Sequence, residues 1–200
     1  MSRITSLVQL DLNKRYTYAD YLTWEVKERI ELIKGKILKM APAPNRKHQR
    51  ISLLLERAID QFLAQMPCEL YHAPFDVRLP LPLNKQSSER FDTVVQPDIV
   101  VVCDTSKLDE QGCNGAPELI IEILSPGNTQ REMKDKFELY EAAGVQEYWL
   151  VDPIRETTIL YHRNAEDRFV GTRPFLAGDT IQSKVLEGFS IEASVFLNEN

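Results

Sequence analysis

The sequence lacks the long apolar runs of membrane proteins, since no stretch approaches the roughly 20 apolar residues of a membrane-spanning helix. Its first segment, MSRITSLVQLDLNKRY, carries charges too early for a secretory signal peptide. Internal repeats and low-complexity tracts are also missing. We therefore expect a soluble cytoplasmic protein with no membrane partner. Its 200 residues, 43% hydrophobic and 27% charged, suffice for a single domain spanning residues 1–200.

Cysteine is scarce, and its spacing excludes two kinds of site. The three cysteines, Cys68, Cys103 and Cys113, are odd in number and form no CxxC pair. A zinc site usually needs closely paired cysteines, and a disulfide framework usually needs an even number. The sequence therefore predicts reduced thiols in a cytosolic compartment.

The chain has no excess of positive charge: 24 Lys and Arg stand against 30 Asp and Glu, for a net charge of -6. This balance excludes a generally basic protein that coats nucleic acid. It allows a nucleic-acid enzyme, because a metal site is locally acidic and binding needs only a basic patch. The phosphate-binding patterns GxxxxGK[ST] and GxGxxG are missing, which gives no support for a nucleotide enzyme.

The spacing of apolar residues predicts a mixed order of helices and strands. Before residue 94 it indicates a capping-box helix at 18–26, a hairpin at 29–40 with its turn at Lys34-Gly35, an amphipathic helix from Asn45 that ends before Pro67, a strand over 75–79 and a loop over 80–93. After it come buried strands near 98–102 and 118–124, a turn at 125–128, a helix that Gly144 ends, a hairpin of 147–151 with 157–161, and then short strands and turns. This order favours an α/β or α+β fold, a mixed β-sheet flanked by helices.

Two acidic residues at the ends of buried strands are the most informative feature. Asp98 follows Pro97 where one apolar run begins, and Glu122 lies near the end of the next. Burying an ionised carboxylate costs several kcal/mol unless the group is paired or binds a metal. If the strands are neighbours, both carboxylates can reach one magnesium ion, with a backbone carbonyl as a further oxygen ligand. Such an ion polarises a phosphodiester and activates water, and a nearby lysine would stabilise the developing charge.

These residues resemble a known superfamily. Gln96-Pro97-Asp98 followed by Glu122-Ile123-Leu124 is similar to the motif of the PD-(D/E)xK nucleases. In particular, the chain resembles a large bacterial family of restriction-endonuclease-like proteins once catalogued as a domain of unknown function. The similarity runs from about residue 18 to 152 and continues through Ser125-Pro126, Lys136 to Tyr140, Gly144-Val145 and Glu147 to Pro153. It implies a restriction-endonuclease-like fold, Mg²⁺ or Mn²⁺ as cofactor, hydrolysis of DNA, and a possible homodimer.

The resemblance also implies which residues form the site. The superfamily lysine falls at position 124, where this chain has leucine, and in the bacterial family it has moved to the following helix. Lys136, four residues before Tyr140, fits that position. Lys134 is the rival, but it lies about 200° away around a helix, so only one of the two can face the site. Glu132 stands where family members often have aspartate.

The predicted catalytic residues are Asp98, Glu122 and Lys136. The predicted metal ligands are Asp98, Glu122, the backbone carbonyl of Ile123 and, through the resemblance, Glu31. Each acidic residue also has a structural alternative. Asp98 could cap a strand start, Glu122 could pair with Arg131 or Lys134, and Glu31 could be an exposed hairpin carboxylate.

The densest basic cluster opens the amphipathic helix. It is predicted to contact a nucleic-acid backbone, because helix N-termini favour anions. Its members are Arg46, Lys47, His48 and Arg50. The alternative for His48 is a place in a solvated first turn.

A second function class stays open. The acidic balance, the missing lysine at position 124 and the Glu132 departure are also compatible with a catalytically inactive nuclease-fold protein that acts in binding or assembly.

Overall fold

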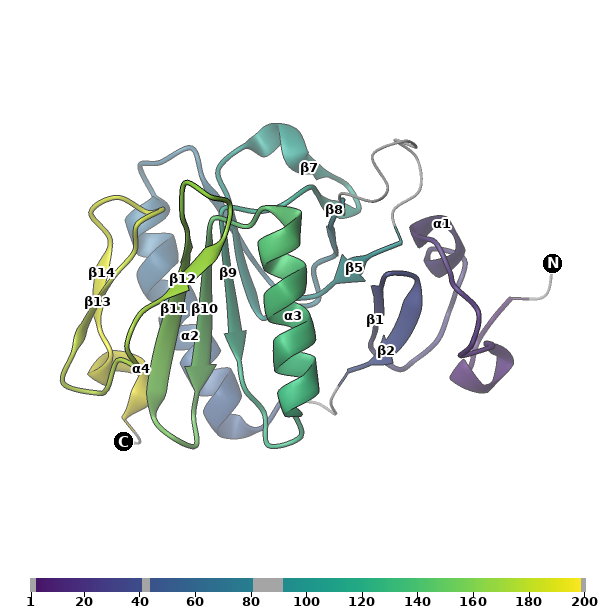
Figure 1. The fold of residues 1–200 in the computed structure, drawn as a ribbon, viewed down its shortest axis with the longest axis horizontal. Helices are drawn as coiled ribbons and strands as arrows, with labels where there is room; N and C mark the ends of the chain where they lie inside the picture. Colours follow the sequence, from purple (N-terminus) through teal and green to yellow (C-terminus); the bar gives the residue numbers. More distant parts are fainter. Residues whose placement is uncertain (1–2, 41–43, 81–91, 199–200) are drawn as a thin grey trace.

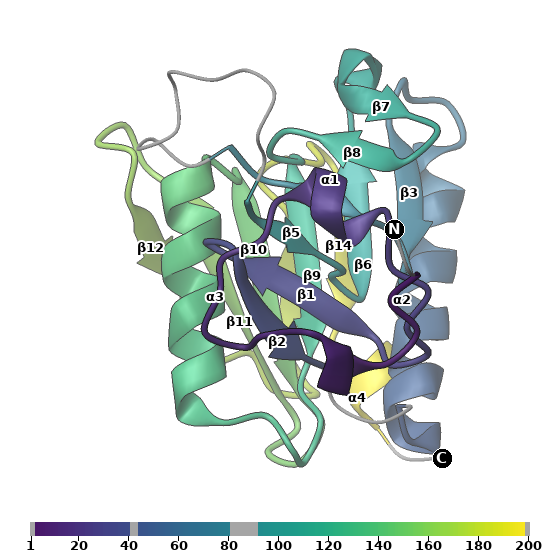
Figure 2. The same cartoon turned by 90° about the vertical axis from the view of Figure 1, so that its right-hand side faces the viewer.

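The central feature of the fold is a six-stranded mixed sheet with one long helix on each face (Figures 1 and 2). The computed structural model describes residues 3–40, 44–80 and 92–198. Strands β9 and β10 run parallel, and the other neighbouring strands of this sheet run antiparallel. In spatial order the strands are β12 (Phe169–Gly171), β11 (Thr157–Arg163), β10 (Glu147–Asp152), β9 (Leu119–Ile123), β6 (Ile99–Val102) and β3 (Glu69–His72). The mixed sheet predicted from the sequence is confirmed.

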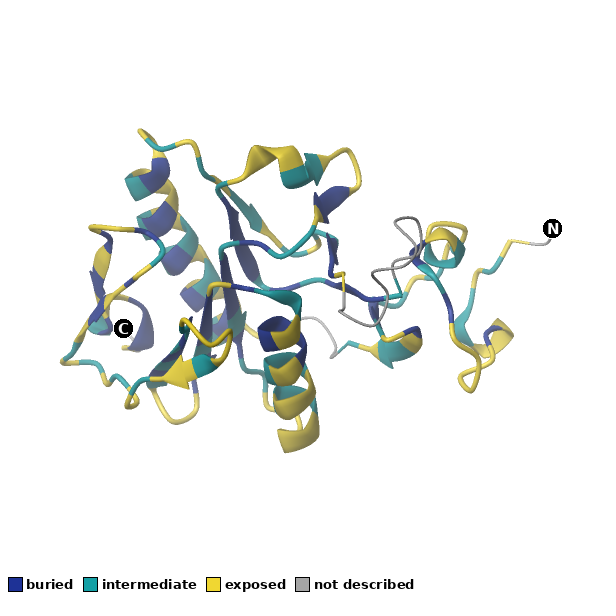
Figure 3. Ribbon diagram, turned by 45° about the horizontal axis from the view of Figure 1, so that its top comes forward, coloured by how far each residue is buried: buried dark blue, intermediate teal, exposed yellow. Residues whose placement is uncertain are grey.

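Both faces of this sheet are buried, one in the cluster that contains α2 (Arg46–Leu63) and the other in the cluster that contains α3 (Gln130–Ala143). Successive side chains of a strand point to opposite sides, so one strand can contribute to both clusters. In β6, Ile99 and Val101 pack in the cluster that contains α2. Val100 and Val102 pack in the cluster that contains α3. Figure 3 shows the resulting buried band through the sheet. Residues buried on both faces explain why these strands read as continuous apolar runs.

The ends of the two helices follow from local chemistry. Asn45 caps α2 by accepting the backbone N–H of His48 at 2.9 Å. Thr129 and Glu132 form a capping box at the start of α3. At its end, Gly144 adopts a left-handed conformation with φ of 99°, as predicted. Helix α2 buries one stripe of side chains against the sheet, and each fully buried one contributes about 1.5–3 kcal/mol; they are Ile51, Leu55, Ile59 and Leu63.

A second sheet lies to one side of the central one (Figure 1). In spatial order its strands are β2 (Lys36–Lys39), β1 (Ile30–Ile33), β5 (Val94–Val95), β4 (Val77–Arg78), β8 (Gly112–Asn114) and β7 (Leu108–Asp109). The hairpin β1–β2 turns at Lys34-Gly35, as predicted, and both turn residues have positive φ. The remaining elements are η1 (Leu7–Gln9), η3 (Thr105–Lys107), a ribbon of β13 (Thr180–Gln182) and β14 (Ser190–Glu192), and α4 (Ser194–Leu197).

Two predicted elements are shorter than expected. The first helix, α1 (Tyr18–Tyr21), ends early because a bridge between Ile4 and Trp24 captures the following backbone. The predicted strand over 75–79 reduces to β4, and Arg78 is buried within it. Its guanidinium forms a 2.6 Å ion pair with Asp109. Most of the predicted loop 80–93 lies outside the described residues.

The prediction of three reduced thiols is wrong for two of them. Cys68 precedes β3 and Cys103 follows β6, and these two cysteines form a disulfide. The antiparallel register places Glu69 opposite Val102, so the next pair outward is the two cysteines. Their separation of 35 residues gives no sign of this pairing in the sequence. Cys113 is a free buried thiol, and burial raises its pKa to about 11.

Within the described part of the chain, no helix combines the length and apolar character needed to cross a membrane.

Candidate active site

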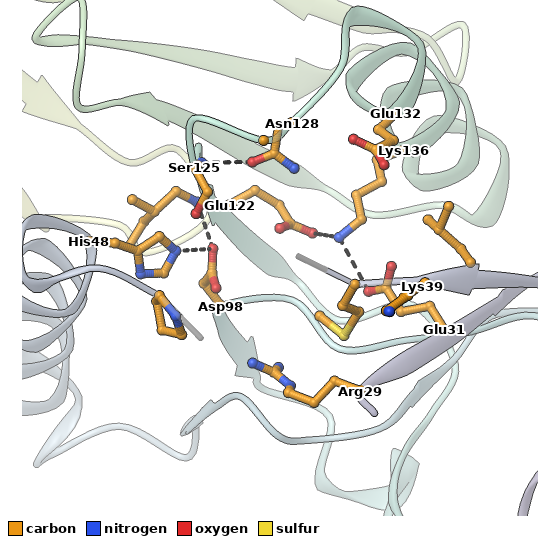
Figure 4. A pocket seen from close by; sticks show the side chains of 15 residues that line it. Arg29, Glu31, Lys39, His48, Asp98, Glu122, Ser125, Asn128, Glu132 and Lys136 are labelled. Atoms are coloured by element: carbon orange, nitrogen blue, oxygen red, sulfur yellow. Dashed lines mark hydrogen bonds and ion pairs between the residues drawn. The ribbon is translucent and has the colours of Figure 1, made fainter. Parts of the chain in front are cut away.

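A pocket of about 390 Å³ opens where β6 and β9 of the central sheet, both long helices and the β1–β2 hairpin meet (Figure 4). Asp98, Glu122 and Lys136 all line it, and so do Glu31, His48 and Arg29. The two predicted acids therefore lie at one site rather than on opposite sides of the sheet. Its lining residues come from three stretches of the chain: residues within 29–48, Asp98, and residues within 122–136.

The proline before Asp98 explains why the Asp98 carboxylate contacts the backbone of β9. The pairing of β6 with β9 ends at Ile99 opposite Ile121. Two residues further along this register, Ile123 would face Pro97, which has no N–H to donate. The Asp98 carboxylate takes the place of the missing ladder partner: its Oδ2 accepts the N–H of Ile123 at 2.8 Å.

The same argument gives the direction of the Ile123 carbonyl, which the His48 ring also approaches: a hydrogen bond to the Ile123 backbone is one of the causes that raise the His48 pKa. In an extended strand, the N–H and C=O of one residue point to the same neighbour. Because the Ile123 N–H points to Asp98, its carbonyl oxygen also faces that side, where Pro97 offers no donor. Ile123 lines the pocket. Its carbonyl oxygen therefore lies on the Asp98 side, next to the His48 ring.

Glu122 projects from β9 toward α3. Its neighbours Ile121 and Ile123 pack on the opposite face with α2, as the strand alternation predicts. Its Oε1 accepts from Lys136 Nζ at 2.7 Å and from the Tyr140 hydroxyl at 2.5 Å. Burial raises the pKa of Glu122 to about 7; the Lys136 ammonium opposes this rise, and the carboxylates of Asp98 and Glu31 add to it.

Of the two candidate lysines on α3, Lys136 lies in the pocket and Lys134 does not. Lys136 is 15% exposed in its side chain, and its ammonium lies between Glu122 and Glu31, at 2.7 and 3.2 Å. Burial lowers the pKa of Lys136, but the charges of the two carboxylates outweigh it, so the pKa lies above its ordinary value. Lys134 points outward, 73% exposed, and pairs with Glu138 at 3.6 Å.

Glu31 is 1% exposed, so the alternative of an exposed hairpin carboxylate is wrong. Its Oε1 accepts the backbone N–H of Gln96 at 2.9 Å and pairs with Lys136. Glu31 thus ties the second sheet to the chain just before Asp98 and holds the site lysine. A direct metal contact by Glu31 stays a prediction.

The structural alternative for Glu122, an ion pair with Arg131 or Lys134, is also wrong. Arg131 pairs with Asp135 on the exposed face of α3, and Lys134 pairs with Glu138 there. Glu132, the departure from the family pattern, lines the pocket and uses its Oε2 to cap α3 through the N–H of Thr129.

His48 differs from both sequence interpretations. It is neither in a solvated turn nor directed outward toward a nucleic-acid backbone, because its side chain is buried and its Nε2 lies 3.2 Å from Asp98 Oδ2. Burial lowers the pKa of His48, but the hydrogen bond and charge of Asp98 raise it more, so the net shift is upward. The sequence held a signal for this, since His48 shares the buried face of α2 with Ile51 and Leu55.

The rest of the predicted basic cluster lies at the surface. Arg46 and Arg50 are exposed, and Lys47 is half-buried with its Nζ 3.4 Å from Glu156. Their predicted contact with nucleic acid stays a prediction.

Tyr140 belongs to the site although the sequence argument used it only as a landmark. It lies one helical turn after Lys136, so both side chains reach Glu122 from one face of α3. The pKa of its hydroxyl is raised well above the ordinary value by burial and by the Glu122 charge. Its i+4 spacing from Lys136 is the signal that identifies it.

The donor atoms fit a hard cation of the magnesium type. Across the residues that the structure covers, no three His, Cys, Asp or Glu side chains form a ready-made metal cluster. Asp98 and Glu122 nevertheless offer oxygens, Oδ1 and Oε2, that take part in none of the hydrogen bonds above, and the Ile123 carbonyl adds a third. An all-oxygen set with few protein ligands suits Mg²⁺, which keeps several waters.

Comparisons with known proteins identify the family to which the sequence is similar. Residues 18–194 match the model of a family described as Uma2, putative restriction endonuclease. An uncharacterised protein of Synechocystis, slr1290, is 28% identical over 148 residues, which cover 72% of this chain and 73% of that protein.

A crystal structure of a putative nuclease belonging to DUF820 from Anabaena variabilis has a similar fold. It superposes with a TM-score of 0.71 at 21% identity and covers 91% of this chain and 97% of its own. This likeness confirms the restriction-endonuclease-like α/β fold predicted from the sequence. With the family match extending over nearly all of the sequence, the chain belongs to the Uma2 family of putative restriction endonucleases.

Proposed function

We propose that this protein is a Mg²⁺- or Mn²⁺-dependent endonuclease that hydrolyses DNA phosphodiester bonds. The observation that carries the proposal is the convergence of Asp98, Glu122 and Lys136 in one pocket, with the Lys136 ammonium 2.7 Å from Glu122. Two acids and one amine at the end of a mixed sheet are the groups that metal-assisted phosphodiester hydrolysis needs.

Asp98, Glu122 and the Ile123 carbonyl would hold the metal ion, with Glu31 as a predicted additional ligand. When bound, the ion supplies Lewis-acid polarisation of the phosphodiester and activates a water molecule. The acidic residues are kept in position by other parts of the chain. His48 Nε2 holds Asp98 from α2, and the Tyr140 hydroxyl holds Glu122 from α3.

Lys136 acts in this proposal as a fixed positive charge and hydrogen-bond donor. The charges of Glu122 and Glu31 raise its pKa, which favours the ammonium over the free amine that a base requires. The ammonium instead stabilises negative charge that develops on the phosphate oxygens, which is worth most in a water-poor pocket. Glu31 Oε1 lies 3.2 Å from the Lys136 Nζ on the other side and holds the ammonium in place.

DNA would approach along the exposed start of α2, where Arg46 and Arg50 can contact phosphates. A homodimer would allow both strands to be cut, because a two-fold axis presents two sites to the two antiparallel strands.

Plasmid cleavage tests the proposal. The purified protein is incubated with supercoiled plasmid in Mg²⁺ or Mn²⁺, beside Asp98→Asn and Glu122→Gln, which keep the side-chain shapes. We expect metal-dependent nicking by the wild type and its loss in both variants. A wild-type protein that takes up metal yet cuts neither plasmid nor short duplexes at any salt concentration would contradict the proposal.

The alternative of an inactive binding or assembly protein is favoured by one observation. The Lys136 ammonium lies between Glu122 and Glu31 and balances charge that a metal would otherwise neutralise. This alternative predicts no uptake of Mg²⁺ or Mn²⁺ in a calorimetric titration, whereas the nuclease proposal predicts uptake that the Asp98→Asn variant weakens.

A further inference from the structure

Arg29 places a guanidinium in the pocket that has no part in holding the acids. It directly precedes β1 and lies two residues before Glu31, so both side chains project from the same side of the hairpin. Figure 4 shows its side chain reaching into the pocket on the side of Asp98, with the Lys136 ammonium on the other side. A neighbouring cavity of about 260 Å³ is also lined by Arg29, Asp98 and His48 and extends along α2. Arg29 thus lies where the two cavities join.

Two basic side chains of the pocket, Lys136 and Arg29, differ in how their charges are balanced. Lys136 contacts two carboxylates. Arg29 makes no ion pair within the part of the chain that the structure describes, and its one side-chain hydrogen bond is a long one, from Nη2 to Gln96 Oε1 at 3.4 Å. Its Nε is buried and has no hydrogen-bond partner among those residues.

An unused guanidinium in such a place favours an anion. A buried donor without a partner costs free energy that a ligand oxygen recovers. Guanidinium keeps its proton at any physiological pH, and its planar fork matches two oxygens of a phosphate. A neutral ligand would leave that charge unbalanced.

The charges around the pocket show when an anion can enter. Its charged lining residues are the acidic Glu31, Asp98, Glu122 and Glu132 and the basic Arg29, Lys39 and Lys136. The lining thus carries one more acidic than basic group, which disfavours an anion. A divalent cation reverses that sign. Arg29 and Lys39 are then the lining cations without an ion pair among the described residues, and of these two Arg29 is the partly buried one.

We propose that Arg29 forms a phosphate subsite, where its guanidinium binds a backbone phosphate of the nucleic-acid strand on the Asp98 side of the pocket. The inference rests on the proposed nuclease function and adds to it the residue that anchors the substrate. Lys136 and Arg29 then have different roles. Lys136 contacts the carboxylates, and Arg29 binds the nucleic-acid strand.

Binding measured without cleavage tests the subsite. A short fluorescein-labelled DNA duplex is titrated in Ca²⁺ instead of Mg²⁺, and anisotropy is followed over a series of KCl concentrations. We expect Arg29→Gln to weaken binding about tenfold and to reduce the salt slope by about one. Arg29→Lys keeps the charge but not the fork, so it should recover part of the affinity.

The matched control is Arg131→Gln, which removes the same charge from a side chain that is 90% exposed on α3. We expect this variant to bind much more tightly than Arg29→Gln. A second readout uses inorganic phosphate, which should raise the melting temperature of the wild type in Ca²⁺ but not that of Arg29→Gln.

Unchanged affinity and salt slope in Arg29→Gln overturn the subsite, and so does a wild type that binds no duplex. If Arg29→Gln does not fold, Arg29→Lys decides: reduced affinity at a wild-type melting temperature supports the subsite, and unchanged affinity overturns it. Plasmid cleavage is measured in parallel. Duplex binding that depends on Arg29 without any cleavage refutes hydrolysis but keeps the subsite, whereas cleavage with Arg29-independent binding refutes only the subsite.

Discussion

At the scale of single residues, the lysines of α3 provide an internal comparison. Lys136→Ala removes the charge from the pocket, and Lys134→Ala removes an equal charge from the exposed face two residues away. We expect Lys136→Ala to lower the cleavage rate by on the order of 10²–10³, the usual effect of losing one charge-stabilising donor. Lys134→Ala should retain wild-type activity. Plasmid nicking rates measure both, and equal rates in the two variants would remove Lys136 from the site.

His48 allows a second prediction at this scale. It contacts Asp98 Oδ2 at 3.2 Å, and Asp98 is a ligand in the proposed metal site. Loss of a group that hydrogen-bonds to a metal ligand typically changes metal affinity by about 10–100-fold. We expect His48→Ala to weaken Mn²⁺ binding by such a factor in a calorimetric titration. The control is Gln49→Ala, at the next position, which is exposed. If the two variants bind Mn²⁺ equally well, His48 does not position Asp98.

At the scale of elements, α3 must end sharply so that β10 can start parallel to β9. Gly144 makes this possible with φ of 99°, and a Cβ there would touch nothing within 4 Å. Gly144→Ala therefore isolates backbone strain, and we expect it to lower the free energy of unfolding by about 1–2 kcal/mol. Gly178→Ala is the control, since its surroundings are also open but no positive φ is required. Urea denaturation should show little or no loss for this control; equal losses would exclude strain at Gly144 as the cause.

At the scale of the whole molecule, Glu147 connects the central sheet to the C-terminal segment. This fully buried carboxylate on β10 accepts from Trp149 Nε1 at 2.5 Å and from the Lys184 N–H at 2.7 Å, and His162 Nδ1 lies 3.2 Å from it. Burial raises the pKa of Glu147, but these donors lower it more, so the net pKa lies below the ordinary value of 4.5. The carboxylate therefore contributes stability above about pH 4.5, and this contribution is lost as pH falls through the lower folded pKa.

Glu147→Gln tests this contribution. We expect the variant to be less stable at pH 7 by about 1–3 kcal/mol, because a buried network loses its charged acceptor. Its stability should also fall less steeply than that of the wild type when the pH is lowered below 4.5. Urea unfolding at a series of pH values measures both effects. Parallel pH profiles for the two proteins would show that Glu147 does not titrate on unfolding.

The sequence by itself determined the features that depend on near neighbours. Apolar periodicity and capping residues located α2, α3 and the β1–β2 hairpin. The proline before Asp98 and the isolated Glu122 in an apolar strand identified the acidic pair, because carboxylates in buried strands are costly without a partner. Together with the motif resemblance, these signals identified the fold and the family.

Only the tertiary structure decided which distant groups meet. Strand register joined Cys68 to Cys103, helix packing turned His48 toward Asp98, and the second sheet buried Glu31 beside Lys136. Periodicity tells which face of an element is buried, but it does not tell what lies opposite that face. Partners are fixed by register and by the packing of layers, and those depend on the whole chain.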